Sequence, residues 1–270
     1  MTGEPATDLA DAYLDAAPRA DADAVEVGPF TLFVSRTPWS YYARPARGRH
    51  DPIGGADLRA LDRACAEHGV ELSVEWVSEV RPELARVAAE YGLEVSTHAL
   101  MVAEPHRVHA PDVDGVRVRV VPAGDPALRA ARAVADVSFG FGGTHPGTPG
   151  AADRDAVAAT LSPDLVDHLD DRARRGLTVT AVAETEDGVV AAGSYQPVDG
   201  AAEVLAVATL PSARRRGLAG LVTALLARHA GEQGVRTVLL SAQDDEVARV
   251  YGRVGFTRVG TAAAAEPPQD

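Results

Sequence analysis

The sequence has a single cysteine, no long apolar run and few positive charges, and each shortage excludes a class of protein. Cys65 is the only cysteine among 270 residues, so the chain can form neither an intramolecular disulfide nor a cysteine-based zinc cluster. No run of 18 apolar residues occurs, so no segment is expected to span a membrane. The acidic start, MTGEPATDLADAYLD, lacks the basic and apolar regions of a secretory signal. These features predict a cytoplasmic protein.

The shortage of positive charge excludes non-specific binding to nucleic acid or anionic lipid. Lysine and arginine number 26 against 39 aspartate and glutamate residues, which gives a net charge of −13. Such a charge repels phosphate backbones and anionic membranes, so we expect neither as a partner. The chain is long enough for one large domain or two small ones, and 46% of it is hydrophobic, enough to form a substantial core.

A repeat links the two halves of the chain. Residues 85–95 read ARVAAEYGLEV and residues 248–258 read ARVYGRVGFTR, which share Ala, Arg, Val and Gly at the same relative positions. Each copy follows a helical stretch, a Gly-Val turn and a short β-rich run, and each leads into a last strand. The shared order of helix, strand, helix and strand indicates an internal duplication.

The duplication predicts two similar lobes, residues 1–108 and 109–270. The segment 104–115 is polar, rich in turn formers and without periodicity, so we expect it to be the linker between them. Residues 1–25 and 266–270 are expected to be frayed ends.

The second lobe reads as one strand, two helices, three antiparallel strands, and then helix, strand, helix and strand. Asp187-Gly188 and Asp199-Gly200 predict hairpins between the three strands, and Pro163 interrupts the second helix. The fold class is therefore α/β, with twisted mixed sheets flanked by helices. The expected helices are Asp57–His68, Asp125–Ser138, Asp153–Arg174 and Leu218–Glu232, and the expected strands are Leu72–Val77, Glu94–Val102, Val116–Val121, Leu177–Glu184, Val189–Pro197, Ala202–Leu210, Thr237–Ser241 and Thr257–Ala263.

The most specific stretch is VLAVATLPSARRRGLAG, residues 204–220. A strand ends at Pro211, and a helix opens at Gly217 among small residues. A helix start offers unpaired N–H groups and the positive end of the dipole to a phosphate, and Arg214–Arg216 add positive charge beside it. Pro211 is expected to let the strand splay from its neighbour, which exposes backbone groups to an extended amide ligand. Phosphate together with extended amides describes coenzyme A.

The pattern Arg214-x-x-Gly217-x-Ala219 after a strand resembles the pyrophosphate-binding signature of the GNAT N-acetyltransferase superfamily. Residues 244–256, DDEVARVYGRVGF, look like the second signature of that superfamily, a helix that bears a tyrosine and ends in Gly-Phe. The element order of residues 116–264 is also that of the family. The chain as a whole is similar to tandem GNAT proteins with one degenerate half.

The resemblance implies acetyl-CoA as co-substrate and no metal. The backbone of three strand residues would meet the acetyl carbonyl and the pantetheine, the following loop would hold the pyrophosphate, and Tyr251 would be the general acid that protonates the departing thiolate. Asp244 stands where the family usually has asparagine, so a cofactor contact there needs a cation or water between. The implied cofactor-binding residues are Val207, Ala208, Thr209, Arg214, Arg215, Arg216, Gly217, Leu218, Ala219, Gly220 and Asp244.

Two of these roles have structural alternatives. Glu203, at the start of the splayed strand, is the candidate general base, but a solvated glutamate at a hairpin exit fits equally, and an ordered water could accept the proton instead. Leu239 occupies the position at which other members carry a glutamate on the next strand. Tyr251 could be simply an aromatic residue on the inner face of an amphipathic helix.

The first lobe is expected to be a degenerate copy. Asp51 and Asp57 lie where the phosphate loop would repeat, and Ala88 replaces the tyrosine. We expect this lobe to brace the catalytic one, with its aromatic residues Trp39, Tyr41, Tyr42 and Trp76 in the core or along the acceptor site. In the second lobe, the Gly/Pro-rich residues 138–150 are expected to form a lid, in which His145 contacts substrate or water. His106 and His109 read as solvated linker residues rather than metal ligands.

The sequence thus predicts transfer of an acetyl group from acetyl-CoA to a primary amine of a small molecule or peptide, by direct attack in a ternary complex. Backbone N–H groups of Val207–Thr209 would stabilise the oxyanion. The acidic surface is compatible with a cationic acceptor such as a polyamine. The alternatives are another acyl-CoA donor, transfer from aminoacyl-tRNA, and a non-catalytic module that senses coenzyme A. We expect a monomer, with a dimer as the alternative.

Overall fold

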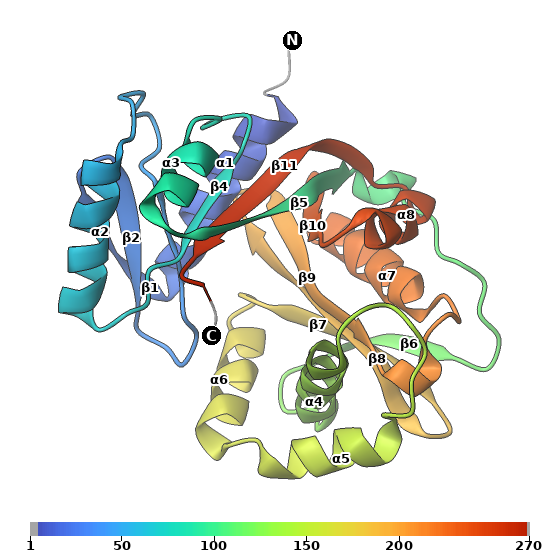
Figure 1. Ribbon diagram of the computed structural model, residues 1–270. Coiled ribbons are helices and arrows are strands. Elements are labelled where there is room, and N and C mark those ends of the chain that lie inside the picture. Colours follow the sequence, from blue (N-terminus) through green and yellow to red (C-terminus); the bar gives the residue numbers. More distant parts are fainter. Residues whose placement is uncertain (1–4, 269–270) are drawn as a thin grey trace. The chain divides into compact units, whose positions relative to one another are not determined.

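The structure is a computed structural model that describes residues 5–268, and the chain divides into two compact units (Figure 1). One unit comprises the chain up to Leu100 together with the segment from Arg258 onward, and the other comprises Met101–Thr257. The first unit therefore takes up the final strand, which the sequence analysis assigned to the second lobe. Within residues 5–268, no helix is both long and apolar enough to cross a membrane.

The first unit is a sheet with helices, and its regular secondary structure begins at Ala6, within the segment expected to be frayed. Its strands lie in the order β1-β2-β3-β4-β11-β5, with β1 antiparallel to β2 and β4 antiparallel to β11. Its helices are α1 (Ala6–Ala16), α2 (Gly55–His68) and α3 (Leu84–Tyr91), and its strands are β1 (Ala22–Val27), β2 (Phe30–Ser35), β3 (Ala43–Pro45), β4 (Val74–Val77), β5 (Glu94–Ala103) and β11 (Thr257–Glu266).

The expectation of a frayed amino-terminal end is wrong for residues 6–25. Helix α1 buries Ala10 and Tyr13, and β1 is paired with β2 along its whole length. The alanine- and aspartate-rich composition hides an amphipathic helix whose apolar residues lie three to four positions apart. At the other end, β11 extends through Glu266. The same expectation for residues 1–4 and 269–270 lies outside the described residues.

Large apolar side chains from α2, α3 and the strands fill the core of the first unit. Trp76 is 1% exposed, and its neighbours in the core include Phe30, Leu58 and Leu84. Trp39 and Tyr41 are half-buried, and the hydroxyl of Tyr42, also half-buried, donates to the Leu14 carbonyl at 3.0 Å. Burial at about 25 cal/mol per Å² of apolar surface makes this cluster the main source of stability in the unit.

Charged groups lie beside this core. The guanidinium of Arg44 is fully buried and donates to Asp11 on α1. Glu75 on β4 faces both Arg44 and Glu266. Burial, followed by the charge of Glu266, raises the pKa of the Glu75 carboxyl to about 7, while Arg44 opposes the shift.

Stability of the first unit should therefore fall as pH rises from about 4.5 towards 7. In this range the folded chain holds a proton on Glu75 that the unfolded chain releases, so the free energy of unfolding falls by up to about 1.4 kcal/mol per pH unit. Glu75→Gln should remove this slope, whereas Glu90→Gln, in an exposed ion pair on α3, should keep it. Denaturant unfolding at pH 5, 6 and 7 measures both, and equal slopes in the wild type and Glu75→Gln would contradict the prediction.

The second unit is a mixed sheet between helical layers, as the sequence predicted. Its strands lie in the order β10-β9-β8-β7-β6; adjacent strands from β6 to β9 are antiparallel to one another, and β10 is parallel to β9. Both Asp-Gly hairpins are confirmed by the pairings Thr185↔Gly188 and Val198↔Ala201. The elements are β6 (Arg117–Val121), α4 (Ala127–Phe141), α5 (Ala151–Thr160), α6 (Pro163–Arg174), β7 (Val179–Thr185), β8 (Gly188–Val198), β9 (Ala201–Thr209), α7 (Leu218–Glu232), β10 (Thr237–Ala242) and α8 (Asp245–Val254).

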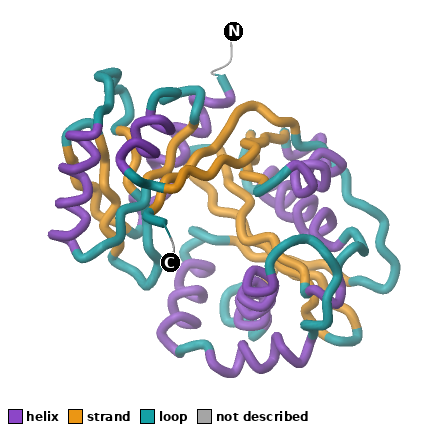
Figure 2. Tube along the Cα trace, in the orientation of Figure 1, coloured by secondary structure: helices purple, strands orange, loops and turns teal. Residues whose placement is uncertain are grey.

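Helices cover both faces of this sheet. Residues 189–193 of β8 are all buried, which requires cover on both sides because successive side chains point to opposite faces. Helices α4 and α7 both contact β8 and β9, and they lie on opposite sides of the strands (Figures 1 and 2). Pro163 interrupts the helical segment as expected: α5 ends at Thr160, and α6 begins at Pro163. The Ser162 hydroxyl caps α6 by accepting from the Leu165 N–H at 3.3 Å.

The segment expected to be a linker is packed against the second unit. Val108 is 3% exposed, and its carbonyl accepts from Arg228 on α7 at 3.2 Å. The His109 N–H donates to the Val254 carbonyl at the end of α8 at 2.7 Å. Proline and polar residues conceal this role in the sequence, because the segment is held by backbone hydrogen bonds rather than by an apolar pattern.

Candidate functional site

Strand β9 separates from β10 after the first three of its nine residues. The two strands pair only from Ala201 to Glu203, and the later residues of β9 face a cavity. The separation was predicted, but its cause differs from the predicted one: Pro211 lies beyond the strand, and β9 bulges at Ala206, whose φ is +52°. Gly193 on β8 lies opposite the bulge, where a Cβ would come within 3.1 Å of Val207. The bulge and the glycine together turn the β9 backbone towards the cavity.

The loop after β9 presents backbone N–H groups at the same cavity. A 3₁₀ turn over Pro211–Ala213 leads into a loop in which Arg215 and Gly217 have φ values of +67° and +81°. No side chain caps the start of α7, and the first helical backbone bond here runs from Leu221 to the Gly217 carbonyl. The N–H groups of Leu218, Ala219 and Gly220 therefore lack helical acceptors and, with the helix dipole, suit an anion.

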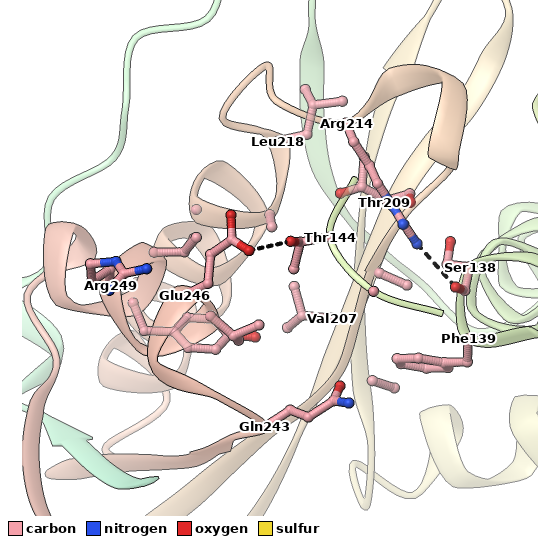
Figure 3. A pocket seen from close by; sticks show the side chains of 18 of the residues that line it. Ser138, Phe139, Thr144, Val207, Thr209, Arg214, Leu218, Gln243, Glu246 and Arg249 are labelled. Atoms are coloured by element: carbon pink, nitrogen blue, oxygen red, sulfur yellow. Dashed lines mark hydrogen bonds between the residues drawn. The ribbon is translucent and has the colours of Figure 1, made fainter. Parts of the chain in front are cut away.

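The strand edge and the helix start meet in one cavity of about 690 Å³ (Figure 3). This volume lies within the range of small-molecule sites. Most residues that the sequence singled out line it, whereas Arg216, Asp244 and Glu203 do not. Those that line it are Val207, Ala208, Thr209, Arg214, Arg215, Gly217, Leu218, Ala219, Gly220 and Tyr251.

Arg214 lines the cavity, but its guanidinium is engaged elsewhere. It donates to the carbonyls of Ser138, Gly142 and His145, each at 3.0 Å, and to that of Thr209 at 3.3 Å. Burial lowers the pKa of Arg214 from its usual value. The side chain thus ties the α4 end and the following loop to β9, and its donors are not directed at the helix start, where the sequence expectation had placed them.

Glu246, on the first turn of α8, joins three elements around the cavity. Its carboxylate accepts from the Thr144 hydroxyl and from Arg215, each at 2.6 Å (Figure 3 shows the Thr144 bond). The hydrogen bond from Thr144 is the main cause, ahead of the charge of Arg215, that lowers the pKa of this carboxyl. Glu246 therefore adds a negative charge to the cavity lining. It also pairs with Arg215, so that the guanidinium of this loop residue is not free to bind an anion.

If acetyl-CoA, the ligand that the sequence resemblance implies, binds at the helix start, removing this charge should strengthen its binding. Glu246→Gln keeps a hydrogen-bond acceptor for Thr144 but releases Arg215, so we expect the Kd to fall about two- to fivefold, as for an exposed ion pair. Glu186→Gln, in the exposed turn between β7 and β8, is the matched control and should leave the Kd unchanged. Calorimetric titration measures both, and weaker binding by Glu246→Gln would show that the carboxylate assists the ligand.

Tyr251 lies on the inner face of α8 and also lines the cavity. It is 8% exposed, and its ring centroid lies 6.1 Å from that of Phe256. Burial raises the pKa of its phenol to about 12, so the hydroxyl is protonated at neutral pH. Tyr251 therefore packs on the inner face of α8 and also lines the cavity, so the two roles that the sequence allowed for it are compatible.

The remaining predicted residues lie outside the cavity lining. The Asp244 carboxylate caps α8 by accepting from the Val247 N–H at 2.8 Å, which accounts for its side chain. Glu203 is half-buried on β9, in register with Gln196 and Leu239 on its two neighbouring strands. Arg216 is exposed on the loop.

Sequence reasoning missed several lining residues. Ser241 and Gln243 are exposed residues on either side of the buried Ala242 at the end of β10, and Phe139 lies in the last turn of α4. The expected lid, residues 138–150, contributes Ser138, Phe139, Gly142, Gly143 and Thr144 to the lining, whereas His145 does not line the cavity and gives its carbonyl to Arg214. The alternation of polar and apolar residues over Ser241, Ala242 and Gln243 was the available sequence signal for two side chains on one face of β10. Further lining residues that were not singled out are Glu246, Val247, Arg249, Val250 and Arg253.

The corresponding helix start of the first unit carries a carboxylate. The loop after β3 leads into α2, in whose first turn Asp57 accepts from the Gly54 N–H at 2.9 Å. This negative charge would repel a pyrophosphate there. Ala88 on α3 is fully buried, as is Cys65 on α2, whose thiol pKa is raised by burial. No cluster of three or more potential metal-binding side chains occurs among residues 5–268.

Comparison with known proteins agrees with this geometry. The acetyltransferase (GNAT) family model matches residues 152–256. No curated protein sequence matches the chain. The solved structure of a GCN5-related N-acetyltransferase from Kribbella flavida is 26% identical, with a TM-score of 0.73, and the match covers 99% of this chain and 98% of that one.

Two further structures share the fold at lower identity. A putative GNAT acetyltransferase from Novosphingobium aromaticivorans is 16% identical, with a TM-score of 0.54 over 93% of this chain and 92% of that one. A tandem GNAT protein from the clavulanic acid biosynthesis pathway is also 16% identical, with a TM-score of 0.54 over 89% and 79%. Together with the matched signature loop, these findings identify residues 152–256 as a GNAT-family domain in a chain that shares the fold of a GCN5-related N-acetyltransferase.

Proposed function

We propose that the second unit transfers an acetyl group from acetyl-CoA to a primary amine of a small molecule or peptide. The observation that carries the proposal is the meeting of an uncapped helix start with an open strand edge in one cavity. The helix start fits a pyrophosphate, and the strand edge fits the amides of a pantetheine arm. Membership of the GNAT superfamily supports acyl-CoA-dependent transfer in general.

The residues at the cavity divide the chemistry between them. Backbone N–H groups of the bulged strand, around Val207 and Ala208, would bind the thioester carbonyl and stabilise the negative charge that develops on its oxygen. The amine attacks the carbonyl carbon, so that the C–N bond forms as the C–S bond breaks. The Tyr251 hydroxyl, protonated at neutral pH, would give its proton to the departing sulfur.

The proton lost by the amine needs an acceptor. Glu203 does not line the cavity, and it has an interaction of its own. We therefore give this role to a water molecule held near Ser241 and Gln243, with Glu203 as the alternative through a chain of waters. The two routes differ in their response to mutation, since Glu203→Gln should leave the rate nearly unchanged if the water route operates.

The experiment that tests the proposal is amine-dependent release of thiol from acetyl-CoA. Purified protein is incubated with acetyl-CoA and a panel of primary amines, and free thiol is measured with and without each amine. Turnover that requires an amine supports the proposal. Binding of acetyl-CoA without turnover of any amine would favour the non-catalytic sensing module, and turnover only with a longer acyl-CoA would favour a different donor.

A further inference from the structure

The end of the cavity that is distant from the helix start has a distinct composition. In Figure 3, Phe139 and Gln243 lie at this end, Leu218 lies at the other, and Val207 lies between them, while the Arg214 side chain reaches from the loop to the Ser138 carbonyl beside Phe139. Because the reacting thioester would meet the strand near Val207, the amine would approach past Phe139 and Gln243. We define the acceptor end by these two side chains together with Ser241, which lines the same cavity two residues before Gln243.

Phe139 is unusual among the apolar side chains of the chain. It is 62% exposed, and Phe141, at 46%, is the only other large apolar side chain that is exposed within residues 5–268. Phe141 has partners in the fold: the Arg214 guanidinium lies 5.4 Å from its ring centroid, and a Cβ on Gly147 would come within 2.4 Å of the ring. Phe139 has no such ring or cation partner among the described residues, so its face is open to a ligand.

The charges around the cavity restrict the acceptor further. Glu246 is the only carboxylate that lines the cavity within the described part of the chain, and Thr144 and Arg215 hold it near the helix start. The acceptor end offers neutral polar groups, Ser241 and Gln243, and no anion for a second ammonium group. The other charged lining residues are cations, namely Arg214, Arg215, Arg249 and Arg253.

We propose that the acceptor is a monoamine bearing an aromatic group that stacks on Phe139, and not a polyamine or another polycation. This inference rests on the proposed function and names its substrate class. The overall charge of −13 acts at long range and would draw any cation towards the protein. Selection within the cavity depends on the local groups, which supply an aromatic face and no second carboxylate.

The test compares 2-phenylethylamine, n-butylamine and spermidine as acceptors for wild type, Phe139→Ala and Phe139→Leu. In the wild type we expect kcat/KM to be highest for 2-phenylethylamine, and spermidine to be no better than n-butylamine. Phe139→Ala should lower kcat/KM for 2-phenylethylamine about tenfold, which is about 1.4 kcal/mol, and should lower that for n-butylamine much less, because only the aromatic amine loses a stacked pair. Phe139→Leu should retain only part of the preference. A preference for spermidine, or an unchanged ratio in Phe139→Ala, would overturn the inference.

A binding measurement separates this inference from the proposed function. Titration of 2-phenylethylamine into the complex with free CoA, in wild type and Phe139→Ala, detects the aromatic site without catalysis. Binding that the substitution weakens supports the acceptor site even if no amine is acetylated. If amines are acetylated but 2-phenylethylamine has no advantage in binding or turnover, the function stands and the aromatic site is wrong.

Discussion

Tyr251→Phe should lower the rate of amine-dependent thiol release by about 10²- to 10⁴-fold, the usual contribution of a positioned general acid. The substitution removes the one buried hydroxyl of α8 that lines the cavity and leaves the ring, which packs near Phe256. Because the phenol is not needed to hold the pyrophosphate, the Kd of acetyl-CoA should change less than about threefold. Steady-state kinetics and calorimetric titration measure the two quantities.

Tyr91→Phe is the matched control for this prediction. Tyr91 ends α3 in the first unit, its hydroxyl donates to Asp62 at 2.8 Å, and it does not line the cavity. Its loss should leave the rate unchanged. If Tyr251→Phe retains the full rate, Tyr251 is a packing residue only, and another group must protonate the thiolate.

Ala219→Glu should weaken the binding of acetyl-CoA at least about 100-fold. The added carboxylate would lie on the first turn of α7, where the unpaired N–H groups face the cavity. It would repel a pyrophosphate and compete for the same donors, and loss of one or two hydrogen bonds to a charged group costs about 3 kcal/mol. Calorimetric titration with acetyl-CoA gives the Kd directly.

The control carries the same charge on another helix. Ala159 is exposed on α5 and does not line the cavity, so Ala159→Glu should bind acetyl-CoA as the wild type does. Thermal unfolding of both variants checks that each is folded. Unchanged affinity in Ala219→Glu would place the pyrophosphate elsewhere and contradict the assignment of the α7 start.

Much of the second unit could be predicted because its signals are local. The Asp-Gly turns fix both hairpins, and α7 was predicted with its observed bounds, Leu218–Glu232, from apolar spacing and the glycine before it. The loop between Arg214 and Gly220 could be located for the same reason, since its residue types are adjacent in the sequence. The amino-terminal helix α1 was missed because alanine weakens the contrast between its two faces.

The arrangement of side chains within the site depends on contacts between distant segments. Arg214 reads as a phosphate ligand beside Arg215, but the α4 end supplies carbonyls that take up its donors. In the sequence, Glu246 is an ordinary acidic residue near a helix start. In the structure it binds Thr144, about a hundred residues earlier in the chain, and Arg215, about thirty residues earlier. No periodicity or motif encodes such pairs. The bulge at Ala206 is likewise a property of strand pairing and of Gly193 opposite it.

The most direct test of a single coenzyme A site is a calorimetric titration of the whole chain with acetyl-CoA, repeated with free CoA and a longer acyl-CoA. We expect one site per chain, since α7 has an open helix start whereas the Asp57 carboxylate lies in the first turn of α2. Binding of acetyl-CoA at one site, abolished by Ala219→Glu, agrees with the second unit as the binding unit. Two sites per chain would contradict the degenerate first unit, and the absence of binding would contradict the assignment of the cavity to coenzyme A.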